Sequence, residues 1–153
     1  TDNKRIQEVY DGIFLNDILL PNNPLKTINN YVVKSKGHTL MIDTCFNTPE
    51  SIARVQEILD YHQIDITKLH LVLTHLHADH TGLASWFEER GATVYMSPTD
   101  GKSVNDMVLP DSPYWQGVVE NSYLQGLKED QLKLENHPGF RFRPQTTLNF
   151  KPL

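Results

Sequence analysis

The sequence predicts an α/β (α+β) domain built on a mixed β-sheet with flanking helices. Alternating and β-branched residues dominate the first forty positions, and the apolar spacing then changes to that of a helix. Between residues 69 and 97, strand, loop, helix and strand patterns follow one another, as in a unit with parallel strands. At 153 residues, the chain has the usual size of one domain and can bury a sizeable core.

The amino-terminal segment predicts strands. Residues 6–20 suggest one or two short strands around Gly12, and the Pro-Asn-Asn-Pro stretch at 21–24 indicates a loop. Residues 27–44 predict a β-hairpin with its turn near positions 35–38.

A helix is expected next. Thr48 is a good N-cap and Pro49 suits the first helical position. Apolar residues then recur at helical spacing through about Tyr61, namely Ile52, Val55, Ile58 and Leu59. This helix should present one apolar face.

The next unit resembles a parallel β-α-β arrangement. Residues 69–74 form a nearly continuous apolar run, as expected of a strand covered on both faces. A helix over 82–90, closed by Gly91, and a strand over 92–97 should follow. Residues 110–134 predict one helix, or two broken near Gly126. Trp115, Val119 and Tyr123 would share a face that packs in the core or contacts a substrate.

Composition narrows the function. A net charge of −5 and a pI near 5.7 give no general attraction to nucleic acid or to an anionic membrane. No apolar run approaches the roughly 20 residues of a membrane span, and the first residues have no signal-peptide pattern. We therefore expect a cytoplasmic protein that acts on a small molecule, without nucleic acid or membrane partners.

The stretch THLHADHTG, residues 74–82, gathers three histidines and an aspartate within six positions. It follows a predicted strand directly, and ligands of such units gather beyond the carboxyl ends of the strands. Imidazole and carboxylate together suit Zn²⁺, although iron and manganese remain open. In extended geometry His75 and His77 could reach one ion, and Asp79 and His80, past a bend, could serve a second.

HLHADH resembles the HxHxDH signature of the metallo-β-lactamase superfamily. Upstream, MIDTC resembles the strand end that precedes the first helix of that family, with Asp43 at its aspartate and Cys45 where glycine is usual. Thr81, Gly82 and the strand at 92–97 also match. The resemblance covers roughly residues 27–100 and is closest to glyoxalase II-like hydrolases.

The resemblance implies an αββα sandwich, two sheets between helices, with a zinc centre at one edge. His75 and His77 would ligate the first ion, Asp79 and His80 the second. Asp43 would support the ligands from behind, and Asp79 would also act in catalysis by orienting water and handling its proton. The reaction implied is hydrolysis of an ester, thioester or lactam.

The family's three further ligands lie downstream, and no residue here matches them. His137 stands outside the expected Gly-His-Thr context and is expected to be a surface group in a turn. We therefore expect residues 1–153 to form a single partial domain, the amino-terminal half of the sandwich, with 101–140 a variable helical segment. Such a half would expose an apolar face and form homodimers or be poorly soluble.

Three functional interpretations remain open. The first is a metallo-hydrolase, truncated here so that the isolated chain is inactive. The second is an iron-dependent oxidoreductase of the same superfamily, similar to persulfide dioxygenases. The third is a non-catalytic metal-binding half-domain.

The other histidines and the cysteine are expected to be structural. His38 falls in a predicted turn and His70 at a strand start, while His62 lies in the last turn of a helix, where a positive charge favours the dipole. Cys45 is expected to be a small buried apolar group.

Overall fold

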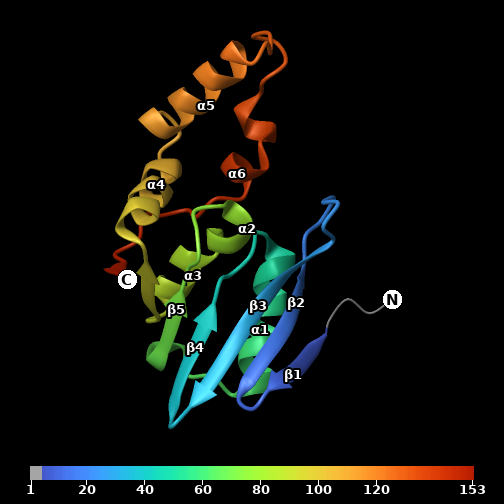
Figure 1. Ribbon diagram of the computed structural model, residues 1–153, viewed down its shortest axis with the longest axis vertical. Coiled ribbons are helices and arrows are strands. Elements are labelled where there is room, and N and C mark those ends of the chain that lie inside the picture. Colours follow the sequence, from blue (N-terminus) through green and yellow to red (C-terminus); the bar gives the residue numbers. More distant parts are fainter. Residues whose placement is uncertain (1–4) are drawn as a thin grey trace.

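The computed structural model describes residues 5–153 and contains a mixed sheet with the strand order β1-β2-β3-β4-β5-β6-β7 (Figure 1). Strands β1 to β4 pair antiparallel, and β4 to β7 pair parallel. Their bounds are β1 (Ile6–Tyr10), β2 (Ile13–Leu19), β3 (Thr27–Ser35), β4 (His38–Ile42), β5 (Leu69–Val72), β6 (Thr93–Met96) and β7 (Lys151–Pro152). The predicted α/β class with a mixed sheet is confirmed.

The antiparallel half agrees with the sequence. Residues 6–20 form two strands, and β3 and β4 form the expected hairpin, whose turn residues Lys36 and Gly37 have φ of 47° and 80°. Helix α1 (Pro49–His62) begins where predicted, because the side chain of Thr48 accepts a hydrogen bond from the Ser51 N–H at 3.1 Å.

The parallel half differs in its helix. A short 3₁₀ turn, η1 (Ile66–Lys68), leads into β5, and two helices, α2 (Ala78–Thr81) and α3 (Ala84–Glu89), replace the single one predicted over 82–90. The helical backbone therefore begins four residues early and includes the aspartate and last histidine of the THLHADH stretch.

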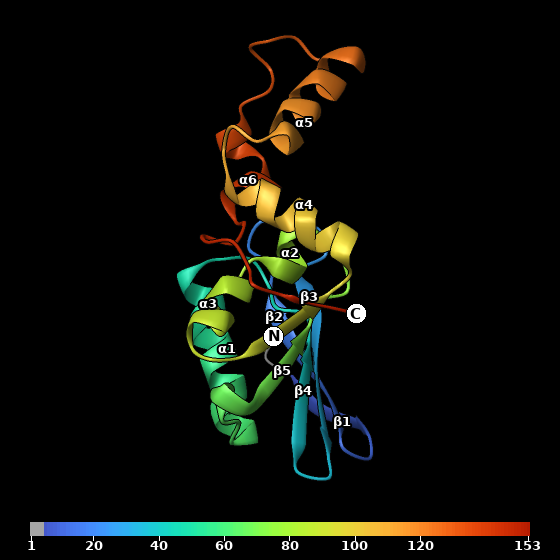
Figure 2. The same cartoon turned by 90° about the vertical axis from the view of Figure 1, so that its left-hand side faces the viewer.

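The core lies between the sheet and helices α1 and α3. Figures 1 and 2 show both helices on one face of the sheet. Side chains from both layers are completely or almost completely buried there, including Val32, Met41, Val55, Ile58, Leu71, Phe87 and Val94.

Among the described residues, no helix covers the opposite face of the sheet (Figure 2). In β5, Leu69 and Leu71 are buried, whereas the outward-facing His70 and Val72 are only half-buried. The expectation that this strand is covered on both faces is therefore wrong for the part of the chain that the structure describes.

Between β6 and β7 the chain makes a long helical excursion, residues 97–150, that lies beyond one end of the sheet (Figures 1 and 2). It contains α4 (Pro98–Val108), α5 (Pro113–Leu124), the 3₁₀ turn η2 (Leu134–Asn136) and α6 (Pro138–Arg141). Most of α4 falls in the segment 101–140 that was expected to be helical, but its start at Pro98 was not predicted, although Ser97 and Pro98 are a good N-cap and first residue for it.

The expectation for residues 110–134 is only partly right. One helix forms, α5, and the chain turns at Gly126, where φ is 95°. Trp115 is buried and donates from Nε1 to the Met107 carbonyl at 2.8 Å, but Tyr123 on the same predicted face is 40% exposed. Only the first turn of α5 therefore packs as core.

Within residues 5–153, every helix is too short or too polar to cross a lipid bilayer.

Candidate metal centre

Asp43 joins the ends of two parallel strands. It follows β4, with φ of 61°, and its N–H donates to the Val72 carbonyl at the end of β5 at 2.9 Å. Its carboxylate accepts hydrogen bonds from the Thr74 N–H at 2.8 Å and the Thr74 hydroxyl at 2.7 Å. It also lies 2.8 Å from Nδ1 of His80. The carboxylate therefore fixes both the start and the end of the histidine-rich loop.

These contacts decide which nitrogen of His80 carries a proton. The Asp43 carboxylate is 5% exposed, and an ionised carboxylate only accepts hydrogen bonds, so Nδ1 of His80 is the donor. Nε2 then keeps a free lone pair and lies 3.8 Å from Oδ2 of Asp79. This pair can offer one nitrogen and one oxygen to a cation.

The same reasoning applies to His75. The hydroxyl proton of Thr74 is donated to Asp43, so Nδ1 of His75, 2.9 Å from that oxygen, must be the donor. Nε2 of His75 is then the acceptor of the 3.2 Å hydrogen bond from Nδ1 of His77, and a zinc ion between the two nitrogens would take the place of that proton. Burial, followed by the nearby His80 and His77, lowers the pKa of His75 and favours the neutral imidazole that binds metals.

The separation of these nitrogens fits a shared zinc ion. Two nitrogen ligands at about 2.0–2.1 Å from a tetrahedral ion lie roughly 3.3 Å apart, close to the 3.2 Å between His75 Nε2 and His77 Nδ1. The rings of His75 and His80 have centroids 4.1 Å apart, so the two pairs adjoin. Within residues 5–153, however, no three histidine, cysteine, aspartate or glutamate side chains are arranged to hold one ion. The described residues therefore offer two adjacent pairs of candidate ligands, His75 with His77 and Asp79 with His80.

Backbone contacts hold the loop against the β4–α1 connection. The His80 carbonyl accepts from both the N–H and the hydroxyl of Thr44, each at 2.7 Å, and that hydroxyl accepts from the Leu83 N–H at 3.2 Å.

At Gly82 a Cβ atom would lie 2.5–2.7 Å from three carbonyl oxygens, those of Cys45, Ala78 and Phe142. Only glycine therefore fits beside the last histidine of the loop.

A buried polar chain that the sequence did not reveal ends at Asp43. Nε2 of His62 lies 3.2 Å from Oδ1 of Asn16, whose amide donates to Asn30 at 3.0 Å, and the Asn30 amide donates to the Asp43 carbonyl at 2.8 Å. Both asparagines are completely buried. They stabilise the left-handed backbone of Asp43 from the core side.

Two of the histidines expected to be structural have clear local partners. Nδ1 of His137 accepts from the Gly139 N–H at 3.1 Å, and its half-buried ring packs edge-on against Trp115. It is therefore part of a packed turn rather than a surface group. Nδ1 of His70 lies 3.1 Å from the Tyr95 hydroxyl.

The expected dipole role of His62 is wrong. The side chain is 4% exposed, and burial, with a smaller contribution from Lys34, lowers its pKa to about 4, so the ring is neutral. Lys34 supplies the positive charge instead, since its Nζ donates to the His62 carbonyl at 2.8 Å.

Cys45 is completely buried, as expected, and burial raises the pKa of its thiol to about 12. It remains a thiol at neutral pH, so it offers no nucleophile next to Asp43.

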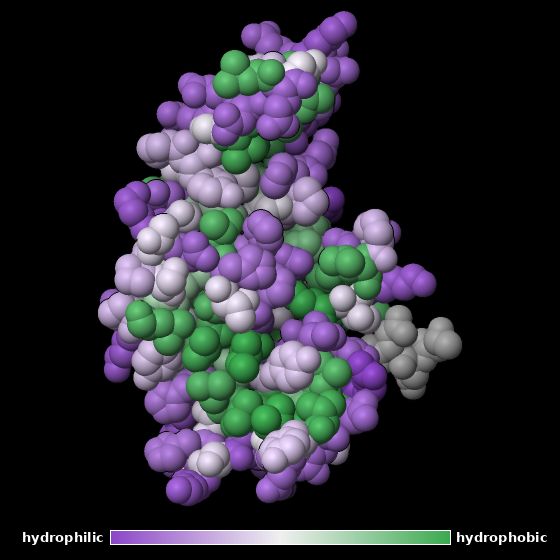
Figure 3. Space-filling model, in the orientation of Figure 1, coloured by the Kyte–Doolittle hydropathy of each residue, from purple (hydrophilic) through white to green (hydrophobic). Residues whose placement is uncertain are grey.

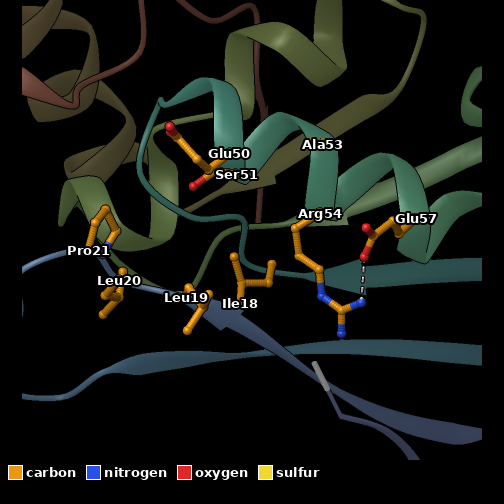
Figure 4. A pocket seen from close by; sticks show the side chains of 9 residues that line it. All are labelled: Ile18, Leu19, Leu20, Pro21, Glu50, Ser51, Ala53, Arg54 and Glu57. Atoms are coloured by element: carbon orange, nitrogen blue, oxygen red, sulfur yellow. Dashed lines mark hydrogen bonds and ion pairs between the residues drawn. The ribbon is translucent and has the colours of Figure 1, made fainter. Parts of the chain in front are cut away.

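A separate apolar cavity of about 450 Å³ lies between the end of β2 and α1 (Figure 4). Ile18, Leu19, Leu20 and Pro21 form one wall. The guanidinium of Arg54 donates to Glu57 and to two backbone carbonyls, so its hydrogen bonds serve the fold. The polar residues that line it are Glu50, Ser51, Arg54 and Glu57, and none of the histidines of the loop contributes to it.

Comparisons with known proteins agree with this fold. The solved structure of a metallo-beta-lactamase family protein from Thermus thermophilus matches 95% of the chain with a TM-score of 0.78 and 24% identity. A beta-lactamase domain protein from Burkholderia ambifaria matches 99% of it, with a TM-score of 0.67 and 17% identity. The chain spans 47% and 44% of these two chains, so it covers about half of their length. At these sequence identities, both comparisons show similarity of fold alone.

One curated relative is similar in sequence. The atrochrysone carboxyl ACP thioesterase of Aspergillus fumigatus is 37% identical over 62 residues, which are 40% of this chain and 14% of the thioesterase. The family model of the metallo-beta-lactamase superfamily matches residues 24–144, well over half of the chain. The chain therefore belongs to the metallo-beta-lactamase superfamily.

Proposed function

We propose that the loop from His75 to His80 is half of a zinc centre that hydrolyses thioesters. The observation that carries this proposal is the convergence of Nε2 of His75 and Nδ1 of His77, 3.2 Å apart, beside the Asp79–His80 pair. The likeness to a thioesterase favours thioesters over the ester and lactam carbonyls that the same chemistry would also attack.

His75 and His77 would hold one ion, and Asp79 and His80 a second. When bound, zinc supplies a Lewis acid that polarises a carbonyl and makes water acidic enough to attack it near neutral pH. Two protein ligands per ion are fewer than the three usual in catalytic zinc sites, so further ligands must come from solvent, another segment or a second chain.

The residues of this chain would divide the remaining work. Asp79 would accept the proton of the attacking water, because its carboxylate lies at the rim of the loop and is 21% exposed. Asp43 would keep His80 in the tautomer whose Nε2 is free, since it holds the Nδ1 proton. The Thr74 hydroxyl would hold the Nδ1 proton of His75 in the same way, so that Nε2 of His75 remains the metal-binding nitrogen.

The test is hydrolysis of matched acyl thioester, ester and lactam substrates by the zinc-loaded protein. Asp79→Asn keeps the size of the side chain and removes its basicity, so kcat should fall by about 10²–10⁴-fold. Asp111→Asn is the control, because this exposed aspartate lies before α5 and its side chain makes no hydrogen bond within residues 5–153. Equal loss in both variants, or full activity of Asp79→Asn, would contradict the assigned role.

A further inference from the structure

Arg141, the last residue of α6, and Arg143, two residues after it, both line a small pocket. The pocket measures about 200 Å³ and is lined by Val108, Arg141, Arg143, Pro144 and Gln145. Its size suits one compact polar group, and its walls carry two guanidinium groups and an amide.

Neither arginine has an acidic partner within residues 5–153. The half-buried guanidinium of Arg143 donates from Nε to the Val108 carbonyl at 3.3 Å and from Nη1 to the Phe140 carbonyl. Its Nη2 has no acceptor among the described residues, and the exposed Arg141 side chain makes no hydrogen bond with them. Two unpaired cations at one pocket are notable in a chain with a net charge of −5.

Aromatic rings hold these guanidinium groups in place. Arg143 stacks on Phe140 with its Cζ 4.0 Å from the ring centroid, and Arg141 lies 5.2 Å from that of Phe142. Stacking covers the flat face of a guanidinium and leaves its N–H groups at the edge, where carboxylates and phosphates bind. Among the described residues, Nη2 of Arg143 and all the N–H groups of Arg141 are without an acceptor. Burial without a counter-ion also lowers the pKa of Arg143, so an anion there would be stabilised.

The pocket is connected to the candidate metal centre by backbone contacts. The Phe142 carbonyl accepts from the Asn47 N–H at 3.2 Å, and the Arg143 carbonyl lies 3.4 Å from the Asn47 amide nitrogen. The same Phe142 carbonyl abuts Gly82, directly after the histidine loop. The arginines are therefore fixed to the connection that holds the loop.

We propose that Arg141 and Arg143 form an anion-binding site for a phosphate group, either free or carried by a larger molecule. The site is independent of the proposed metal chemistry, because none of its groups is a candidate metal ligand. Phosphate is favoured over a single carboxylate because the N–H groups of Arg141 and the Nη2 group of Arg143 can share its several acceptor oxygens.

The test is titration of the metal-free protein, kept in a chelator, with inorganic phosphate at constant ionic strength. Binding is followed by NMR of the backbone amides and of the arginine Nε–H groups. Saturable binding is expected, weakened about tenfold or more in Arg141→Gln, because charge-assisted hydrogen bonds are lost. Arg143→Lys keeps the positive charge but removes the planar guanidinium that stacks on Phe140, and it should also weaken phosphate binding.

Arg90→Gln is the matched control, since this exposed arginine also stacks on an aromatic ring, Trp86, and within residues 5–153 its side chain donates only to a carbonyl. No saturation in the wild-type protein, or equal weakening in Arg90→Gln and Arg141→Gln, would overturn the proposal. A parallel titration with glycerol 3-phosphate separates the sources: tighter binding than inorganic phosphate assigns the site to a phosphate on a larger molecule, and equal binding assigns it to the free ion. Because metal is absent throughout, failure here leaves the proposed zinc site untouched.

Discussion

At the scale of single residues, Asp43 is the group on which the candidate centre depends most. Its carboxylate accepts from Thr74 twice and from His80 once, and the buried amide of Asn30 holds its carbonyl. Each of these contacts fixes a proton or a backbone angle before any cation binds. As a result, Nε2 of His75 and Nε2 of His80 are both left without a proton of their own.

Asp43→Asn should weaken zinc binding by about 10–100-fold, because the amide cannot accept from both Thr74 and His80 with full charge. The affinity is measured by competition with a chromophoric chelator. Asp65→Asn is a close control, since Asp65 also accepts from a threonine N–H and hydroxyl, those of Thr67, but at an exposed 3₁₀ turn. Zinc affinity that is unchanged in Asp43→Asn would contradict the role of this carboxylate.

His62 makes a prediction about acid stability. Its pKa in the folded protein is about 4, below the ordinary 6.5, so between these values the unfolded chain binds the extra proton. The neutral, buried His62 therefore contributes to the free energy of unfolding above pH 6.5, and this contribution is lost as the pH falls to about 4. The loss amounts to at most about 3 kcal/mol. Urea unfolding as a function of pH measures it, and His62→Gln should flatten the decline between pH 6.5 and 4. If the free energy of unfolding of the variant declined equally steeply between pH 6.5 and 4, the loss of stability in acid would be caused by other groups.

At the scale of elements, the loop between β5 and α3 is built on close backbone contact. The short helix α2 carries Asp79 and His80, and its end is pressed against the β4–α1 connection and the segment after α6. This contact joins the helical excursion to the site, because Phe142 belongs to that excursion and its ring packs on Phe46 with centroids 4.7 Å apart.

Gly82→Ala should destabilise the fold by roughly 1–3 kcal/mol, since the added methyl group meets three carbonyl oxygens at 2.5–2.7 Å. Gly117→Ala is the opposite control: nothing lies within 4 Å of its Cβ position inside α5, so it should stabilise the helix by about 0.5–1 kcal/mol. Chemical denaturation measures both. Equal effects of the two substitutions would contradict the packing at Gly82.

The sequence predicted those elements whose signals are local. The hairpin of β3 and β4, the cap of α1 and the strand before the histidines depend on neighbouring residues, and the structure confirms them. The split of α2 from α3 at Leu83, where φ is −96° and ψ is 8°, was not predicted. The close approach of the Phe142 carbonyl to Gly82 was missed because the two residues are sixty positions apart in the chain. The buried pair Asn16 and Asn30 was missed for a similar reason, since their contact depends on strand register.

In the candidate site, too, contacts between neighbouring residues were predictable from the sequence and contacts between distant residues were not. The sequence predicted His75, His77, Asp79 and His80 as a group because they are adjacent, and the structure brings them together. Asp43 was associated with them only through a family resemblance, since its contact with His80 requires the parallel pairing of β4 and β5. Whether these residues bind metal stays a prediction.

At the scale of the whole molecule, the sheet is asymmetric. Seven apolar side chains point away from α1 and α3 and line up across four strands, and we call them the open face: Ile13, Leu15, Tyr31, Val33, Leu40, Ile42 and Val72. Figure 3 shows a continuous apolar area over this part of the sheet. Patches of this kind in soluble proteins are usually covered by another protein surface.

We expect this chain to self-associate through the open face. Its mass, measured by light scattering, should rise with concentration, and Val33→Lys together with Val72→Lys should keep it monomeric, because each lysine would place a charge in the apolar contact. Leu124→Lys, on α5 and 85% exposed, should have no such effect. A wild-type chain that stays monomeric at high concentration would contradict this expectation.

The metal centre is the central claim, and calorimetric titration of zinc into the metal-free chain tests it most directly. The wild-type chain should bind zinc saturably, and the double variant His75→Ala, His77→Ala should lose the first ion. A second double variant, His38→Ala, His70→Ala, removes two histidines whose rings lie 6.4 Å apart at the other end of the strands and should bind zinc normally. No binding by the wild-type chain, or undiminished binding after loss of His75 and His77, would contradict the assignment of this loop as a metal site.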